Sequence, residues 1–211
     1  MENLDEIVEQ IHQDFETRTK ARDQALQQAR ILTRHCAKAI RAVHRDEYPL
    51  AQEFLDKAGQ LVHELAINLA DFPDIFYAGY TQDAFKEFAE AQIVMALVKH
   101  QPLPTPEELG LNYATYLKGL AEAVGELRRR CLDIIRHSHS AEAEHLLSQM
   151  DEIYAILVTM DYPDAITGGL RRLTDLVRGI TERTRGDLTI SLRQESLEQK
   201  LQALEEKIAP D

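Results

Sequence analysis

The stretch TQDAFKEFAEAQIVMALVKH, residues 81–100, decides the fold. It contains neither Gly nor Pro, and its apolar residues recur at the helical period, which predicts a helix from Asp83 to His100. Apolar side chains cover nearly the whole circumference, as is typical of a central, buried helix. Glu87 and Glu90 lie about 60° apart within the apolar sector. Because an unpaired buried carboxylate is unfavourable by several kcal/mol, we expect these two to have a partner: a proton, a cation or a metal ion.

Length and composition predict a single all-α domain that spans residues 1–211. The chain is 44% hydrophobic, which is ample for a core, and Gly and Pro are nearly absent from its periodic segments. No apolar run is long enough to cross a membrane, and the acidic N-terminus lacks the basic residues of a signal peptide. We therefore expect a cytoplasmic protein with no membrane partner. Cys36 and Cys131 have no paired spacing, so we expect reduced thiols with a structural role.

Residues 4–47 predict one very long N-terminal helix that ends near Pro49. The segment has no Gly or Pro, and its apolar residues keep a spacing of three or four. At about 1.5 Å per residue the helix would exceed roughly 60 Å, more than a compact monomer of this size needs. Part of it is expected to pack on another subunit, which predicts a homo-oligomer.

Further helices are predicted along the rest of the chain. A loop rich in Pro follows His100, and Thr105-Pro-Glu-Glu resembles a short capped turn. The last helical region begins at Leu170, and Gly186-Asp187 is expected to interrupt it. The other predicted helices cover residues 49–70, 112–137, 138–160 and 192–208.

A cationic stripe stands out in a chain whose net charge is −12. No acid occurs between Gln24 and Arg45, and the basic residues there repeat every three or four positions on one helix face. A solvated face normally mixes charges of both signs, so a polyanion explains this one better. A phosphate backbone would fit, with binding that weakens steeply as salt rises. The stripe consists of Arg30, Arg34, Lys38, Arg41 and Arg45.

A second pair of carboxylates, Glu122 and Glu126, has i, i+4 spacing on the helix predicted over 112–137, with arginines 128–130 following. A solvent-exposed, salt-bridged face is one interpretation. The other is that this helix faces the Glu87–Glu90 helix, so that four carboxylates converge. Such a set of oxygen ligands suits Mg²⁺ or Mn²⁺, which could activate water and stabilise charge on a phosphodiester.

At the level of motifs, the chain resembles the translin and TRAX family, and most closely its TRAX-like archaeal branch. The resemblance covers most of the sequence. The motifs that carry it are residues 29–45, FKEFAEA at 85–91, YLKGLAEAVGEL at 116–127 followed by RRRC, and GLR at 169–171.

The resemblance implies an all-α, translin-like bundle of about seven helices that assembles into a hollow octamer, encloses RNA and cleaves it with a metal ion. By position, Glu87, Glu90, Glu122 and Glu126 would be the catalytic, metal-binding carboxylates. The family's catalytic subunit usually has Asp where this chain has Glu122, and the extra methylene moves the carboxylate by about 1.5 Å. The residues expected to position RNA are Arg30, Arg34, Lys38, Arg41, Arg45, Arg128, Arg129 and Arg130.

Three functional hypotheses follow. The first is an endoribonuclease, dependent on Mg²⁺ or Mn²⁺, that acts on single-stranded or short duplex RNA inside a homo-oligomer. The second is a non-catalytic shell that binds single-stranded nucleic acid, with single-stranded DNA as a further possible ligand. The third is a di-iron oxidoreductase, because Glu9-x-x-His12 and Glu142-x-x-His145 are spaced as in carboxylate-bridged helical bundles.

Overall fold

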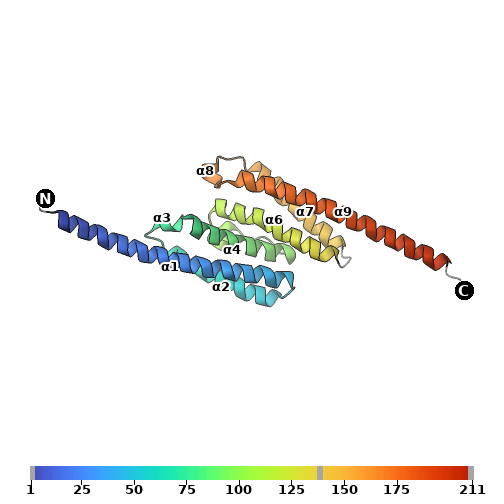
Figure 1. The fold of residues 1–211 in the computed structure, drawn as a ribbon, viewed down its shortest axis with the longest axis horizontal. Coiled ribbons are helices and arrows are strands. Elements are labelled where there is room, and N and C mark those ends of the chain that lie inside the picture. Colours follow the sequence, from blue (N-terminus) through green and yellow to red (C-terminus); the bar gives the residue numbers. More distant parts are fainter. Residues whose placement is uncertain (1–2, 137–139, 209–211) are drawn as a thin grey trace. The chain divides into compact units, whose positions relative to one another are not determined.

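The computed structural model describes residues 3–136 and 140–208, and every regular element in these ranges is a helix (Figure 1). This confirms the all-α class and the very long N-terminal helix, which has 41 residues. About seven helices were predicted, whereas the described ranges contain six long helices and three single turns of four residues, α3, α5 and α8. The helices are α1 (Leu4–His44), α2 (Tyr48–Asn68), α3 (Pro73–Phe76), α4 (Gly79–Val98), α5 (Pro106–Leu109), α6 (Tyr113–Ile135), α7 (Ser140–Thr159), α8 (Asp164–Thr167) and α9 (Leu170–Ile208).

The chain forms two compact units. The first consists of residues 1–95 and 103–119, and the second of residues 96–102 and 120–211. Two helices contribute to both units, because α4 continues past Met95 and α6 continues past Gly119 without a break. The organisation of residues 1–211 as a single domain stays a prediction.

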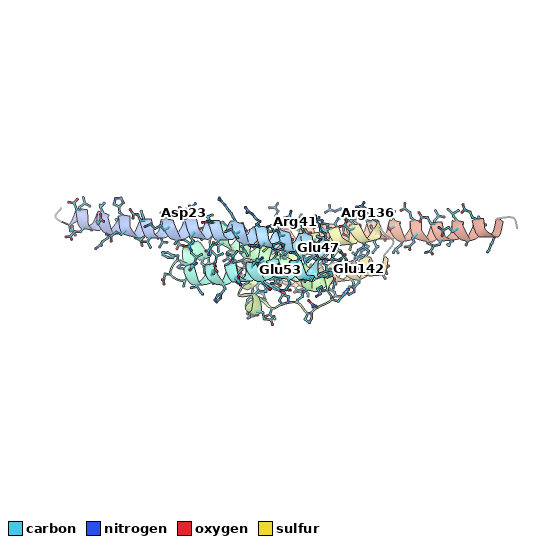
Figure 2. All side chains as sticks on the ribbon, turned by 90° about the horizontal axis from the view of Figure 1, so that it is seen from below. Asp23, Arg41, Glu47, Glu53, Arg136 and Glu142 are labelled. Atoms are coloured by element: carbon cyan, nitrogen blue, oxygen red, sulfur yellow. The ribbon has the colours of Figure 1, made fainter. Side chains whose placement is uncertain are left out.

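In the first unit, α1 and α2 form a hairpin, with Arg41 on the first helix and Glu53 on the second (Figure 2). The chain reverses at Asp46, whose backbone adopts the left-handed conformation with φ 59°. The second half of α1 buries an apolar face that includes Leu32, Cys36 and Val43.

The N-terminal part of α1 has no such cover. All residues from 3 to 17 are exposed, although five of them form an apolar stripe with helical spacing. This agrees with the expectation that the helix is longer than a compact monomer needs. The stripe consists of Leu4, Ile7, Val8, Ile11 and Phe15.

In the second unit, α7 packs on α9, and the predicted interruption at Gly186-Asp187 is wrong. A Gly inside a helix is unfavourable by only about 1 kcal/mol relative to Ala, and here ion pairs hold the helix on both sides of it. Arg185 donates to both carboxylate oxygens of Asp151 at 2.6 and 2.8 Å, and Asp187 lies 2.8 Å from the Arg128 guanidinium. These long-range contacts explain why α9 remains continuous.

The structure corrects one helix boundary and confirms one capped turn. α4 begins at Gly79, four residues before the predicted start, and ends at Val98. The capped turn at α5 is confirmed, because the Thr105 hydroxyl accepts from the Glu108 N–H while the Glu108 carboxylate accepts from the Thr105 N–H. Among the described residues, no helix combines the length and apolar character needed to cross a membrane.

Candidate metal centre and anion-binding surface

The centre of the first unit is α4, which is buried on almost every side, as predicted. Phe85, Phe88 and Ala89 are buried, and so is Glu90, which is only 9% exposed. Glu87, three residues earlier, is half-buried. The two glutamates offer carboxylate oxygens that lie within 4.8 Å of each other. An apolar helix therefore holds two oxygen ligands close together, the donor type that hard divalent cations prefer.

The negative charges of this pair affect the pKa of a cysteine on the neighbouring helix α1. Cys36 is completely buried there, and burial is the main cause that raises the pKa of its thiol. The negative charges of Glu87 and Glu90 raise that pKa further. A cation of the chain also approaches the pair, because the Lys86 ammonium lies 3.5 Å from a Glu87 carboxylate oxygen. The expected need of these carboxylates for positive charge is thus partly met by the protein itself.

A close approach of α6 to α4 fixes the backbone beside the pair. A Cβ atom placed on Gly119 would lie 2.5 Å from the Ala89 Cβ and 2.9 Å from both the Glu90 amide nitrogen and the Lys86 carbonyl oxygen. Contacts this short do not occur in proteins, so only glycine fits here. Helical periodicity alone does not predict this role. The available signal was a Gly inside a strongly helical pattern, which usually has a packing reason.

The second carboxylate pair lies on the continuation of α6. Glu122 and Glu126 are both half-buried and share one face of the helix. Glu122 comes three residues after Gly119, which is about 4.5 Å along the helix axis. A Glu126 carboxylate oxygen lies 3.7 Å from the Arg129 guanidinium. The role of these two glutamates as ligands stays a prediction.

The cationic stripe is exposed along its whole length on α1 and the residue after it. None of its five residues forms an ion pair with any described part of the chain. Elsewhere on the same helix an arginine is neutralised, since Arg18 donates to Asp74 at 2.6 Å. The stripe is therefore a row of like charges without compensating acids, a surface that favours a polyanion.

The arginines at 128–130 differ from the stripe because each has an acidic partner in the second unit. Arg128 pairs with Asp187 at 2.8 Å and also donates to the Thr184 hydroxyl. Arg130 pairs with Glu142 at 3.1 Å. Arg129, whose side chain is 54% exposed, has only the longer contact with Glu126 within the described residues.

The remaining candidates have structural surroundings. Burial raises the pKa of the Cys131 thiol to about 12, in keeping with a structural role. Glu9 and His12 lie on the exposed end of α1, where Glu9 accepts from Gln13. Because Glu142 is engaged by Arg130, the two Glu-x-x-His pairs give no support to the di-iron hypothesis.

The fold and these surfaces define a class: an all-helical protein whose central helix carries a carboxylate pair and whose longest helix exposes uncompensated positive charge. No protein-family model matches the chain. An uncharacterized protein of Methanocaldococcus jannaschii is 31% identical over 187 residues, which cover 87% of this chain and 82% of that protein.

Solved structures are similar over nearly their full length. AfC3PO in complex with duplex RNA is 29% identical with a TM-score of 0.82, over 89% of this chain and 97% of that one. The crystal structure of AfC3PO is 29% identical with a TM-score of 0.81, again over 89% of this chain and 97% of that one. Apo-NeC3PO, at 17% identity and a TM-score of 0.80 over 87% and 96%, shares the fold. The chain belongs to the translin family.

Proposed function

We propose that this chain is a metal-dependent endoribonuclease that binds and cleaves RNA inside a hollow homo-oligomer. The observation that carries the proposal is the pair of half-buried Glu87 and buried Glu90, whose carboxylate oxygens lie within 4.8 Å of each other in a helix that is buried on almost every side. The similarity to AfC3PO, which has been solved with duplex RNA, supports RNA as the ligand.

In this proposal Glu87 and Glu90 of α4, with Glu122 and Glu126 of α6, hold Mg²⁺ or Mn²⁺. The fit rests on the donor type, because all four side chains offer carboxylate oxygens and neither ion favours softer ligands. When bound, such an ion supplies an activated water and neutralises charge that develops on the phosphodiester. The apolar packing of α4 restricts the rotamers of Glu90 and so orients its carboxylate.

The RNA-binding residues of the proposal are the cationic stripe together with Arg128, Arg129 and Arg130. The stripe has the stronger support, since its charges lack acidic partners within the described ranges. Of the three arginines on α6, Arg129 is the one whose weak, exposed ion pair could be exchanged for a phosphate. Arg128 and Arg130 are held by shorter ion pairs and would position RNA less directly.

A homo-oligomer is proposed from the uncovered end of α1. Its apolar stripe, from Leu4 to Phe15, is exposed along one helix face, and apolar faces of this kind mark protein interaction sites. An octamer is the size that the family resemblance implies.

The alternative is a translin-like shell that binds single-stranded nucleic acid without cleaving it. A specific observation favours it: the Lys86 ammonium, 3.5 Å from Glu87, already compensates part of the buried negative charge. In that case the carboxylates are paired with cations of the chain and no metal ion is needed. Glu122 in place of Asp is a second feature on this side.

Metal removal separates the two functions. Labelled single-stranded RNA and short duplex RNA are incubated with the chain in EDTA, and then with Mg²⁺ or Mn²⁺ restored in excess. We expect binding in both conditions, and cleavage only when the ion is present. Binding without cleavage at any ion concentration would establish the shell, and undiminished cleavage in EDTA would contradict a metal-dependent reaction.

The stripe is tested through the salt dependence of RNA binding. We expect the logarithm of the binding constant to fall linearly with the logarithm of salt concentration, by about 0.7 to 0.9 per phosphate contact. Arg34→Gln should reduce this slope by about 0.7 to 0.9, the value expected for the loss of one phosphate contact. Arg18→Gln is the matched control on the same helix α1, because the charge of Arg18 is already neutralised by Asp74 of α3. Binding that does not weaken with salt would contradict the role of the stripe.

A further inference from the structure

Two lysines from different helices meet on one aromatic ring. Phe54 of α2 is half-buried, and the Lys38 ammonium of α1 lies 5.3 Å from its ring centroid. The Lys57 ammonium of α2 lies 5.7 Å from the same centroid. The His35 ring is 5.9 Å from the Phe54 ring and tilted by 35°. The Phe54 ring is thus in contact with a cation from each helix of the hairpin.

Lys57 has an obvious alternative partner that it does not use. Glu53 precedes it by four residues on α2, the spacing at which helical ion pairs form. Yet Lys57 forms no ion pair within the described residues, and its ammonium lies over the Phe54 ring instead. It is the only Lys or Arg of α2, so the single cation of this helix adds to the positive face of its neighbour.

The positive potential at this position acts on His35. Burial is the main cause that lowers the pKa of its imidazole, and the charges of Lys38, Lys57 and Arg34 lower it further. In addition, the His35 Nδ1 atom is buried and lacks a hydrogen-bond partner in the part of the chain that the structure describes. The site therefore gathers positive charge, and neither Lys38 nor Lys57 forms an ion pair with an acid of the described residues.

We propose that Lys38 and Lys57, held in place by the Phe54 ring, form a phosphate subsite across the α1–α2 hairpin that binds a backbone phosphate of RNA. The inference rests on the proposed RNA-binding function and extends it, because the binding surface widens from one helix to two. A phosphodiester offers non-bridging oxygens that both ammonium groups can contact by charge-assisted hydrogen bonds. The face of Phe54 attracts each cation and limits its motion, so that both charges are positioned before RNA arrives.

The test compares Lys57→Gln with Lys20→Gln, which removes the same charge from an exposed position ten residues before Arg30. RNA affinity is measured over a range of salt concentrations for both variants and for the unaltered chain. For Lys57→Gln we expect binding several-fold weaker for RNAs of any sequence, and a salt slope reduced by about 0.9 on duplex RNA or 0.7 on a single strand. Lys20→Gln should leave the slope unchanged.

A double-mutant cycle shows whether the two lysines share one phosphate. If they do, Lys38→Gln combined with Lys57→Gln should weaken binding by less than the product of the two separate factors. Lys57→Gln that matches Lys20→Gln in affinity and slope, while Arg34→Gln still weakens binding, would overturn the subsite alone. Failure of the unaltered chain to bind RNA would overturn the proposed function and the subsite together. Lys57 is exposed, and unchanged thermal unfolding of its variant confirms that the fold is intact.

Discussion

Glu90→Gln should reduce the rate of RNA cleavage by roughly a hundredfold or more, because loss of an ionic ligand removes several kcal/mol of charge stabilisation from the transition state. The substitution keeps the volume of the side chain and removes only its charge, so the packing of α4 is retained. RNA binding should be preserved, since the change takes a negative charge away from a protein that binds a polyanion. Rates measured in single-turnover reactions, with binding measured in EDTA, separate the two effects.

Asp83→Asn is the matched control. It removes a negative charge from an exposed position on the same helix, four residues before Glu87, and should leave cleavage unchanged. Metal binding can also be measured through the thermal stability of the protein. A ligand at 100 times its Kd stabilises the folded state by about 2.7 kcal/mol, so Mg²⁺ or Mn²⁺ should raise the Tm of the unaltered chain but not that of Glu90→Gln.

Glu126→Ala tests the other half of the proposed ligand set on α6. It should abolish cleavage while RNA binding persists. Retained cleavage in either glutamate variant would contradict the assignment. If neither variant changes the response of the Tm to metal ions, then the carboxylates are balanced by cations of the chain, as Lys86 already does for Glu87.

Gly119→Ala should destabilise the protein by about 1 to 3 kcal/mol or more, the range found when a packed interior is overfilled. The added methyl group would lie 2.9 Å from the Glu90 amide nitrogen and the Lys86 carbonyl oxygen, and backbone atoms cannot move aside as a flexible side chain does. To relieve the clash, α6 must shift away from α4 at the residues that carry Glu87 and Glu90. Because a displacement near 1 Å can reduce catalysis by about a hundredfold, cleavage should fall as well.

Gly125→Ala, on the same helix, should stabilise the protein where Gly119→Ala destabilises it. A Cβ atom at Gly125 meets nothing within 4 Å, so Ala should stabilise α6 by up to about 1 kcal/mol through its higher helix propensity. Urea unfolding of both variants compares the free energies of unfolding. Equal stabilities of the two Ala variants would show that α6 does not approach α4 closely at Gly119.

The helices could be predicted from the sequence because periodicity, Pro positions and capping residues act over a few neighbouring residues. The capped turn at Thr105 and the long helix from Leu4 are predicted in this way. The predicted break at Gly186 is wrong for a long-range reason: Asp151 and Arg128 form ion pairs with the residues on either side. Local propensity favoured an interruption there, and contacts from other helices prevent it.

By itself, the sequence determined the all-α class, the burial of α4 with its two glutamates and the position of the cationic stripe on one helix face. Only the tertiary structure decided which charges have partners, because partners such as Arg128 and Asp187 lie far apart along the chain. It distinguished the stripe, which forms no ion pair within the described ranges, from the paired arginines of α6. It also placed Lys38 and Lys57 over the Phe54 ring and revealed the close contact at Gly119. Each of these depends on how two helices pack, a property that the pattern of a single helix does not contain.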